Sequence, residues 1–179
     1  MPPQTNALSD CPTANDLACI VMHAVSEHHR TGLGLGDLLG LNPRELKDLC
    51  LELSIYDYYP AIEMQNTAVR SEQQSITTLI IWRGRRTDRQ ALWLAKILAR
   101  RAMEPHHLWE DLGLPSRERL NTLMMREFPA LARQRPSNMR WKKFLYRQIC
   151  ADPGHTVCPA PSCDACNEYD ACFVTGEMA

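Results

Sequence analysis

The sequence predicts an all-α fold, a bundle of about six or seven helices followed by an irregular, cysteine-rich loop that binds a metal cluster. Three features of the 179-residue chain predict it: apolar residues at helical spacing, several helix-capping motifs, and four cysteines gathered near the C-terminus. The expected units are a flexible lead at residues 1–14, a helical bundle at 15–150 and a cysteine-rich tail at 151–179.

The first helix is expected from Asp16 to about Arg30. Asn15 is a suitable N-cap, apolar residues recur at helical spacing over 17–25, and Thr31-Gly32 should end the helix. The glycines of residues 33–36 do not complete a dinucleotide-binding fingerprint and follow no expected strand. This stretch therefore does not indicate a nucleotide site.

Two similar helical hairpins are expected from an internal repeat. Residues 39–45 align at a constant offset with 112–118, with five identities, which also leaves coincidence open. Asn42-Pro43-Arg44-Glu45 forms a capping box with proline at the first helical position. Each unit should contain a short helix, a Leu-Gly-Leu turn and a capped helix that ends at an aromatic-proline pair, Tyr59-Pro60 or Phe128-Pro129.

Three further helices complete the expected bundle. One covers about residues 71–82, although its β-branched residues also permit a strand. Another is opened by a capping box at Thr87–Gln90 and ends before Pro105. The last, 137–150, interleaves basic and aromatic residues.

The net charge of −1 hides three segments of different sign. Residues 1–69 contain three Lys or Arg and nine Asp or Glu, residues 70–150 contain seventeen and seven, and residues 151–179 contain none and five. No apolar run approaches the ~20 residues that cross a bilayer, and the first residues lack the features of a secretory signal. A cytoplasmic location is expected, in which cysteines bind metals or catalyse more often than they form disulfides.

The tail carries a C-x4-C-x2-C-x5-C arrangement, Cys158, Cys163, Cys166 and Cys172. Four thiolates on a short loop can enclose a soft metal centre. The first three follow the spacing of plant-type ferredoxins, whereas structural zinc usually takes two separated short pairs. The spacing favours an iron-sulfur cluster over zinc or disulfides, and His155 is a candidate additional ligand.

The tail pattern, the stretch 141–150 and the stretch 107–114 together resemble the NifQ family of nitrogen-fixation proteins, most clearly over residues 88–173. The resemblance implies a metallochaperone rather than an enzyme. Proteins of this family are described as carrying an iron-sulfur cluster that incorporates molybdenum. They are described as donating that metal for synthesis of the iron-molybdenum cofactor of nitrogenase. The resemblance implies that the four tail cysteines are the cluster ligands. It also implies two partners, the cofactor scaffold complex and the nitrogenase reductase component.

The arginine-rich middle of the chain is a candidate site for attracting molybdate, a dianion, or for docking an acidic partner. The candidate residues are Arg133, Arg135, Arg140, Lys142, Lys143 and Arg147. The alternative function is a zinc-stabilised, basic helical regulator that binds nucleic acid through residues 139–147. A pI of about 6.6 and the acidic tail disfavour that alternative.

Other metal-binding or reactive side chains have structural explanations. His107 is expected to cap or pack a short helix with His106 in solvent, and Cys150 to pack at a helix end, although assistance to the cluster stays open for all three. Trp93, Trp109 and Trp141 are expected in the core. No nucleophile, base and acid stand at a spacing that indicates catalysis.

Overall fold

The protein is all-helical throughout residues 11–55 and 69–150, the parts that the computed structural model describes. These parts contain nine helices and no strand, which confirms the predicted fold class. The number exceeds the expected six or seven because three helices have five residues or fewer. The helices are α1 (Pro12–Thr31), α2 (Leu35–Leu39), α3 (Pro43–Glu52), α4 (Ser71–Gly84), α5 (Arg89–Ala102), α6 (Leu108–Asp111), α7 (Arg117–Glu127), α8 (Pro129–Ala132) and α9 (Trp141–Cys150).

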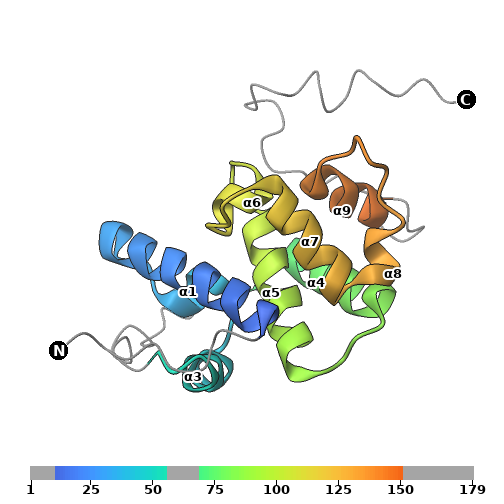
Figure 1. Cartoon of the computed structure of the whole chain (residues 1–179). Coiled ribbons are helices and arrows are strands. Elements are labelled where there is room, and N and C mark those ends of the chain that lie inside the picture. Colours follow the sequence, from blue (N-terminus) through green and yellow to red (C-terminus); the bar gives the residue numbers. More distant parts are fainter. Residues whose placement is uncertain (1–10, 56–68, 151–179) are drawn as a thin grey trace, which may run out of the picture.

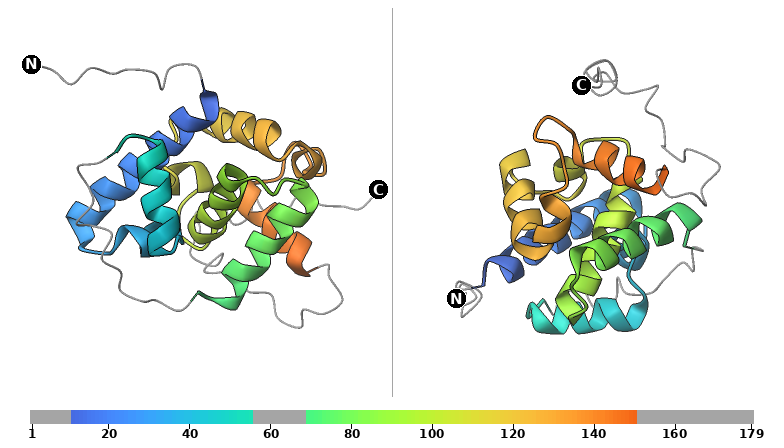
Figure 2. Two further views of the ribbon diagram at one scale, coloured as in Figure 1. Left: turned by 90° about the horizontal axis from the view of Figure 1, so that it is seen from below. Right: turned by 90° about the vertical axis from the view of Figure 1, so that its right-hand side faces the viewer.

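Helix α5 forms the centre of the bundle. It lies between α1 to α3 on one side and α7 to α9 on the other (Figure 1; left view of Figure 2). Its main neighbour is α4, and it also packs against α2 and α6. Buried alanines, leucines and an isoleucine follow most of its length, so it presents apolar surface in several directions. Helix α4 in turn contacts α8 and α9.

The two predicted hairpins are present, with α2 and α3 in the first and α6 and α7 in the second. Gly40 (φ 66°) and Gly113 (φ 68°) occupy the left-handed region, where glycine avoids the steric penalty of a side chain. The Asn42 side chain accepts a hydrogen bond from the Glu45 backbone N–H at 2.9 Å, and Ser116 accepts one from Arg119 at 3.3 Å. The repeated short helix, turn and capped helix are therefore confirmed.

The two hairpins end differently, contrary to the sequence-based expectation. Helix α7 ends at Glu127, directly before Phe128-Pro129, as predicted. Helix α3 already ends at Glu52, and Ser54 adopts a left-handed conformation (φ 55°), well before the predicted end near Pro60. Tyr59-Pro60 itself lies outside the described residues.

Two predicted helix starts are wrong, in each case because a better cap or first residue is available. Helix α1 begins at Pro12, whose fixed φ suits the first helical position, so Asn15 and part of the expected lead lie inside the helix. The N-cap of α5 is Asp88, whose carboxylate accepts from Ala91 N–H at 3.1 Å, and not Thr87. The C-terminal end of α1, at Gly32, is where it was predicted.

The segment open to strand assignment forms α4, as predicted, despite its β-branched residues. The last helix begins at Trp141, later than expected, because Pro136 and Met139 close a turn through a 3.0 Å backbone hydrogen bond. Among the described helices none combines the length and the apolar character that a membrane span requires.

Candidate functional site

The predicted metal ligands fall outside residues 11–55 and 69–150. This applies to Cys158, Cys163, Cys166 and Cys172 and to His155, so their arrangement stays a prediction. Within the described parts no three His, Cys, Asp or Glu side chains gather as a metal site. The candidate features that can be placed are the histidines and the basic residues of the middle segment.

Lys142, one of the predicted molybdate-attracting residues, is held inside the fold. Its Nζ donates to Asp111 Oδ2 at 2.5 Å and to the Glu104 carbonyl at 2.5 Å, which joins α9 to α6. Burial lowers the pKa of the ammonium group, and the hydrogen bond to Asp111 opposes this shift. Lys142 therefore positions α9 and is not available to an anion in solution.

Arg135, also in the predicted set, is engaged with its own surroundings. Its guanidinium lies 4.7 Å from the centre of the Trp141 ring and donates to the Met139 carbonyl. Asn121 Oδ1 accepts from Arg135 at 3.2 Å and from Trp141 Nε1 at 2.7 Å. These contacts fix the segment that leads into α9, and burial lowers the pKa of Arg135.

The expected roles of the other singled-out residues are largely confirmed. His107 is the N-cap residue of α6, and its N–H donates to Glu110 at 2.9 Å. His106 is exposed, although its Nδ1 lies 3.0 Å from Asp111 Oδ1. Trp93 and Trp141 are buried, and the partly buried Trp109 packs against the same core. The Cys150 side chain lies outside the described part of the structure, so its expected packing stays a prediction.

Many cations of the middle segment are neutralised by buried carboxylates. Arg119 and Arg126 lie 2.6 and 2.8 Å from the two oxygens of Asp16, and Arg86 lies 2.5 Å from Glu127. Asp16 and Glu127 are both 2% exposed. Thr13 also donates to Glu127, so this charge cluster ties the start of α1 to α7.

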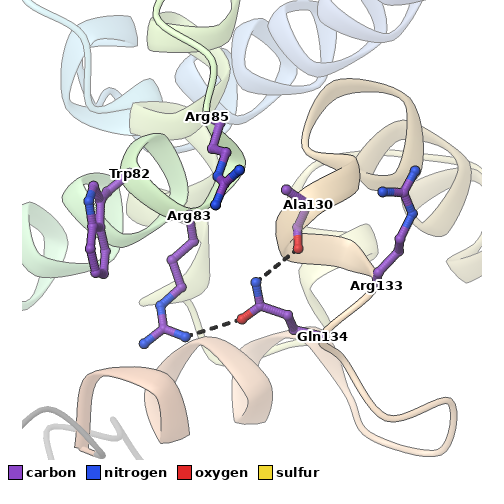
Figure 3. A pocket seen from close by; sticks show the side chains of 6 residues that line it. All are labelled: Trp82, Arg83, Arg85, Ala130, Arg133 and Gln134. Atoms are coloured by element: carbon purple, nitrogen blue, oxygen red, sulfur yellow. Dashed lines mark hydrogen bonds between the residues drawn. The ribbon is translucent and has the colours of Figure 1, made fainter.

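A basic hollow lies on another face, between the end of α4 and the α8 region (Figure 3). Its volume is about 570 Å³, it opens to solvent, and its lining residues are Trp82, Arg83, Arg85, Ala130, Arg133 and Gln134. Arg83 donates to Gln134 Oε1 at 3.1 Å, and the Gln134 amide donates to the Ala130 carbonyl at 2.9 Å. We call these six residues the arginine hollow.

The hollow contains only one member of the predicted basic set, Arg133. Arg83 and Arg85 are absent from the predicted set, whose members all lie between residues 133 and 147. The sequence feature that could have indicated them is the run Arg83-Gly84-Arg85-Arg86, which directly follows Trp82. The sequence alone does not show that α8 brings Arg133 to the same place.

Known proteins resemble this chain over most of its length. The NifQ family profile matches residues 16–174. The protein NifQ of Rhodobacter capsulatus is 46% identical over 144 residues, which cover 80% of this chain and 76% of that protein.

The chain belongs to the NifQ family. A NifQ homolog of Sinorhizobium fredii is 34% identical over 163 residues, covering 89% of this chain and 71% of that protein. NifQ of Azotobacter vinelandii is 44% identical over 104 residues, 58% of this chain and 53% of that protein. No solved structure matches the chain. The resemblance to NifQ drawn from the tail pattern and the stretches 107–114 and 141–150 is thus confirmed, and it places the protein in nitrogen fixation.

Proposed function

We propose that this NifQ-family protein holds an iron-sulfur cluster on Cys158, Cys163, Cys166 and Cys172. The cluster takes up molybdenum, and the protein donates that metal for assembly of the iron-molybdenum cofactor. The observation that carries the proposal is that the family match, residues 16–174, extends through the whole C-x4-C-x2-C-x5-C motif. The protein acts as a metal donor and not as an enzyme.

The chemistry of the donor set supports this proposal. Four thiolates are soft ligands that suit iron-sulfur and thiophilic metal centres. Residues 151–179 contain no Lys or Arg, so the negative charge of such a centre must be balanced from elsewhere. Residues 70–150 contain seventeen of the twenty Lys and Arg of the chain, most of them arginine. This distribution suits an anionic cargo that is later handed to a partner.

Transfer is proposed to involve the cofactor scaffold complex and the nitrogenase reductase component. Purified protein loaded with molybdenum should supply the metal to a reconstituted cofactor synthesis that contains these two partners. The measurement is the molybdenum content of the cofactor formed. Cofactor synthesis that proceeds equally well with a variant lacking the four tail cysteines would contradict the donor role.

The cluster itself is tested by the Cys163→Ala and Cys166→Ala variants. Protein purified without oxygen should be brown, contain iron and acid-labile sulfide, and give an electron paramagnetic resonance signal in an appropriate redox state. Each variant should lose most of its iron, because a thiolate ligand is removed. Metal analysis is the measurement, and Cys11→Ser, a change at an exposed cysteine, is the matched control.

A colourless wild-type protein that contains zinc instead of iron would contradict the cluster proposal. It would favour the zinc-stabilised regulator. The structure offers that alternative little support on α9, because Trp141, Phe144 and Tyr146 are all buried. Aromatic residues must be exposed to stack on bases.

A further inference from the structure

Two arginines of the arginine hollow, Arg85 and Arg133, differ from the arginines that pair with buried carboxylates. No carboxylate lines the hollow, whereas the arginines of α7 and Arg86 face buried carboxylates. Neither Arg85 nor Arg133 takes part in an ion pair within residues 11–55 and 69–150. Arg83, Arg85 and Arg133 are all among the lining residues of the hollow, so positive charge gathers around one open volume.

The frame of the hollow is rigid because α4 and α8 meet tightly behind it. A Cβ added to Gly84 would lie 2.6 Å from Phe128 Cδ1, so only glycine permits this approach. Phe128 is fully buried and directly precedes α8. The contact fixes the distance between the two walls, with Arg83 and Arg85 on one and Arg133 on the other.

Arg85 adopts an unusual backbone conformation at this position. It is the C-cap of α4, with φ 56°, and its N–H donates to the Ile81 carbonyl at 3.0 Å. Glycine or asparagine is normally preferred in such a left-handed cap. Glycine would fit this position better, which makes the Arg85 side chain a candidate for a role other than stability. In Figure 3 that side chain points toward the space between α4 and α8.

Guanidinium groups recognise oxyanions particularly well. Each presents a planar fork of N–H donors that can bond two oxygens of one anion. Gln134 adds an amide whose orientation is fixed by Arg83 and by the Ala130 carbonyl. Several donors around a volume larger than one small anion leave room for its hydration water.

We propose that the arginine hollow binds a tetrahedral, doubly charged oxyanion through Arg85 and Arg133, with Arg83 beside them. Molybdate, sulfate and hydrogen phosphate share this chemistry. The identification of molybdate as the relevant ligand rests on the proposed function, whereas anion binding by the hollow does not. The site would collect the anion on the folded bundle through guanidinium groups and not through thiolates.

The test is a titration of the full-length protein with sodium molybdate at low ionic strength. Heat and tryptophan fluorescence are both measured, because Trp82 is 70% exposed and lines the hollow. Arg85→Gln and Arg133→Gln should each weaken binding about five- to tenfold, since each removes a charged donor. The matched control is Arg44→Gln, an exposed arginine on α3, which should leave the affinity unchanged.

Sulfate and phosphate titrations distinguish the source of the oxyanion. Both should compete with molybdate and show the same dependence on Arg85 and Arg133. A higher affinity for molybdate than for sulfate supports its assignment as the ligand, and the reverse order overturns that assignment. Equal weakening by Arg44→Gln, or no saturable heat in the wild type, overturns the site itself.

Iron content separates this inference from the proposed function. Arg85→Gln and Arg133→Gln should retain the iron of the wild type, because the proposed ligands are the tail cysteines. If the wild type contains no iron but binds molybdate through these arginines, the cluster proposal fails and the anion site stands. If iron is present and the arginine variants bind molybdate normally, only the anion site fails.

Discussion

Two groups of arginines that are close in sequence serve opposite purposes in this molecule. Arg86 bonds to Asp88 and Glu127, whereas Arg85 points into an open hollow without a carboxylate. The arginines of the first group are Arg86, Arg119 and Arg126. Together with Asp16 and Glu127 they form what we call the paired cluster. The positively charged residues of 70–150 therefore have two different roles. Some connect helices through buried carboxylates, and others face solvent.

The paired cluster exchanges hydration for protein contacts. Glu127 accepts from Thr13, Arg86 and Arg126, so its buried carboxylate has several donors. A buried pair of this kind is not strongly stabilising in itself, because both charges lose water. Removal of Glu127 is nevertheless damaging, because the buried Thr13 hydroxyl loses its acceptor and Arg86 and Arg126 each lose one of two carboxylate partners. Arg85 and Arg133, in contrast, are exposed and take part in no ion pair within the described parts of the chain.

The largest expected effect comes from Glu127→Ala. It leaves Thr13, Arg86 and Arg126 without their shared acceptor and should lower the free energy of unfolding by about 2–4 kcal/mol. Urea denaturation at neutral pH measures this change. Glu118→Ala, at an exposed position of the same helix, should change stability much less. An equal loss in both variants would show that the paired cluster is not the cause.

Gly84→Ala should have an intermediate effect and should connect the two halves of the comparison. The added methyl group would overlap the Phe128 ring, which is fully buried. Overpacking of this kind destabilises by about 1–3 kcal/mol, although the better helix propensity of alanine offsets part of it. Urea denaturation measures the loss, and the exposed Gln74→Ala on α4 serves as the control.

The same Gly84→Ala variant should bind molybdate more weakly, because the end of α4 moves relative to Arg133. The titration described for the arginine hollow measures this. A variant that is destabilised but binds molybdate as the wild type does would show that the α4–α8 contact does not determine the anion site.

The sequence predicts those parts of the fold that depend on local signals. Gly40, Gly113 and the Asn42 capping box each specify a turn or helix start through their own backbone requirements. The early end of α3 was not predicted, because a proline marks only the latest possible end of a helix. The cysteine ligands were proposed from spacing and family likeness, and their geometry lies outside the described residues.

The arginine hollow could not be predicted because it depends on a tertiary contact. Arg83 and Arg85 come from the end of α4, while Arg133 and Gln134 follow α8. The contact between α4 and α8, which includes the packing of Gly84 on Phe128, brings these segments together. The charge count of residues 70–150 correctly indicated excess arginine, but it could not distinguish Arg135, which packs on Trp141, from Arg133.

The smallest expected effect on stability comes from the double variant Arg85→Gln/Arg133→Gln. Neither side chain joins an ion pair in the described parts of the chain, and their like charges border the same hollow. The free energy of unfolding should therefore stay within about 0.5 kcal/mol of the wild type, or rise slightly as repulsion is relieved. Urea denaturation without added oxyanion measures it. A loss of about 2 kcal/mol would mean that these arginines hold the fold as the paired cluster does. With unchanged stability and weakened molybdate binding, the two groups would differ as the structure indicates, because only the hollow would be free to bind a ligand.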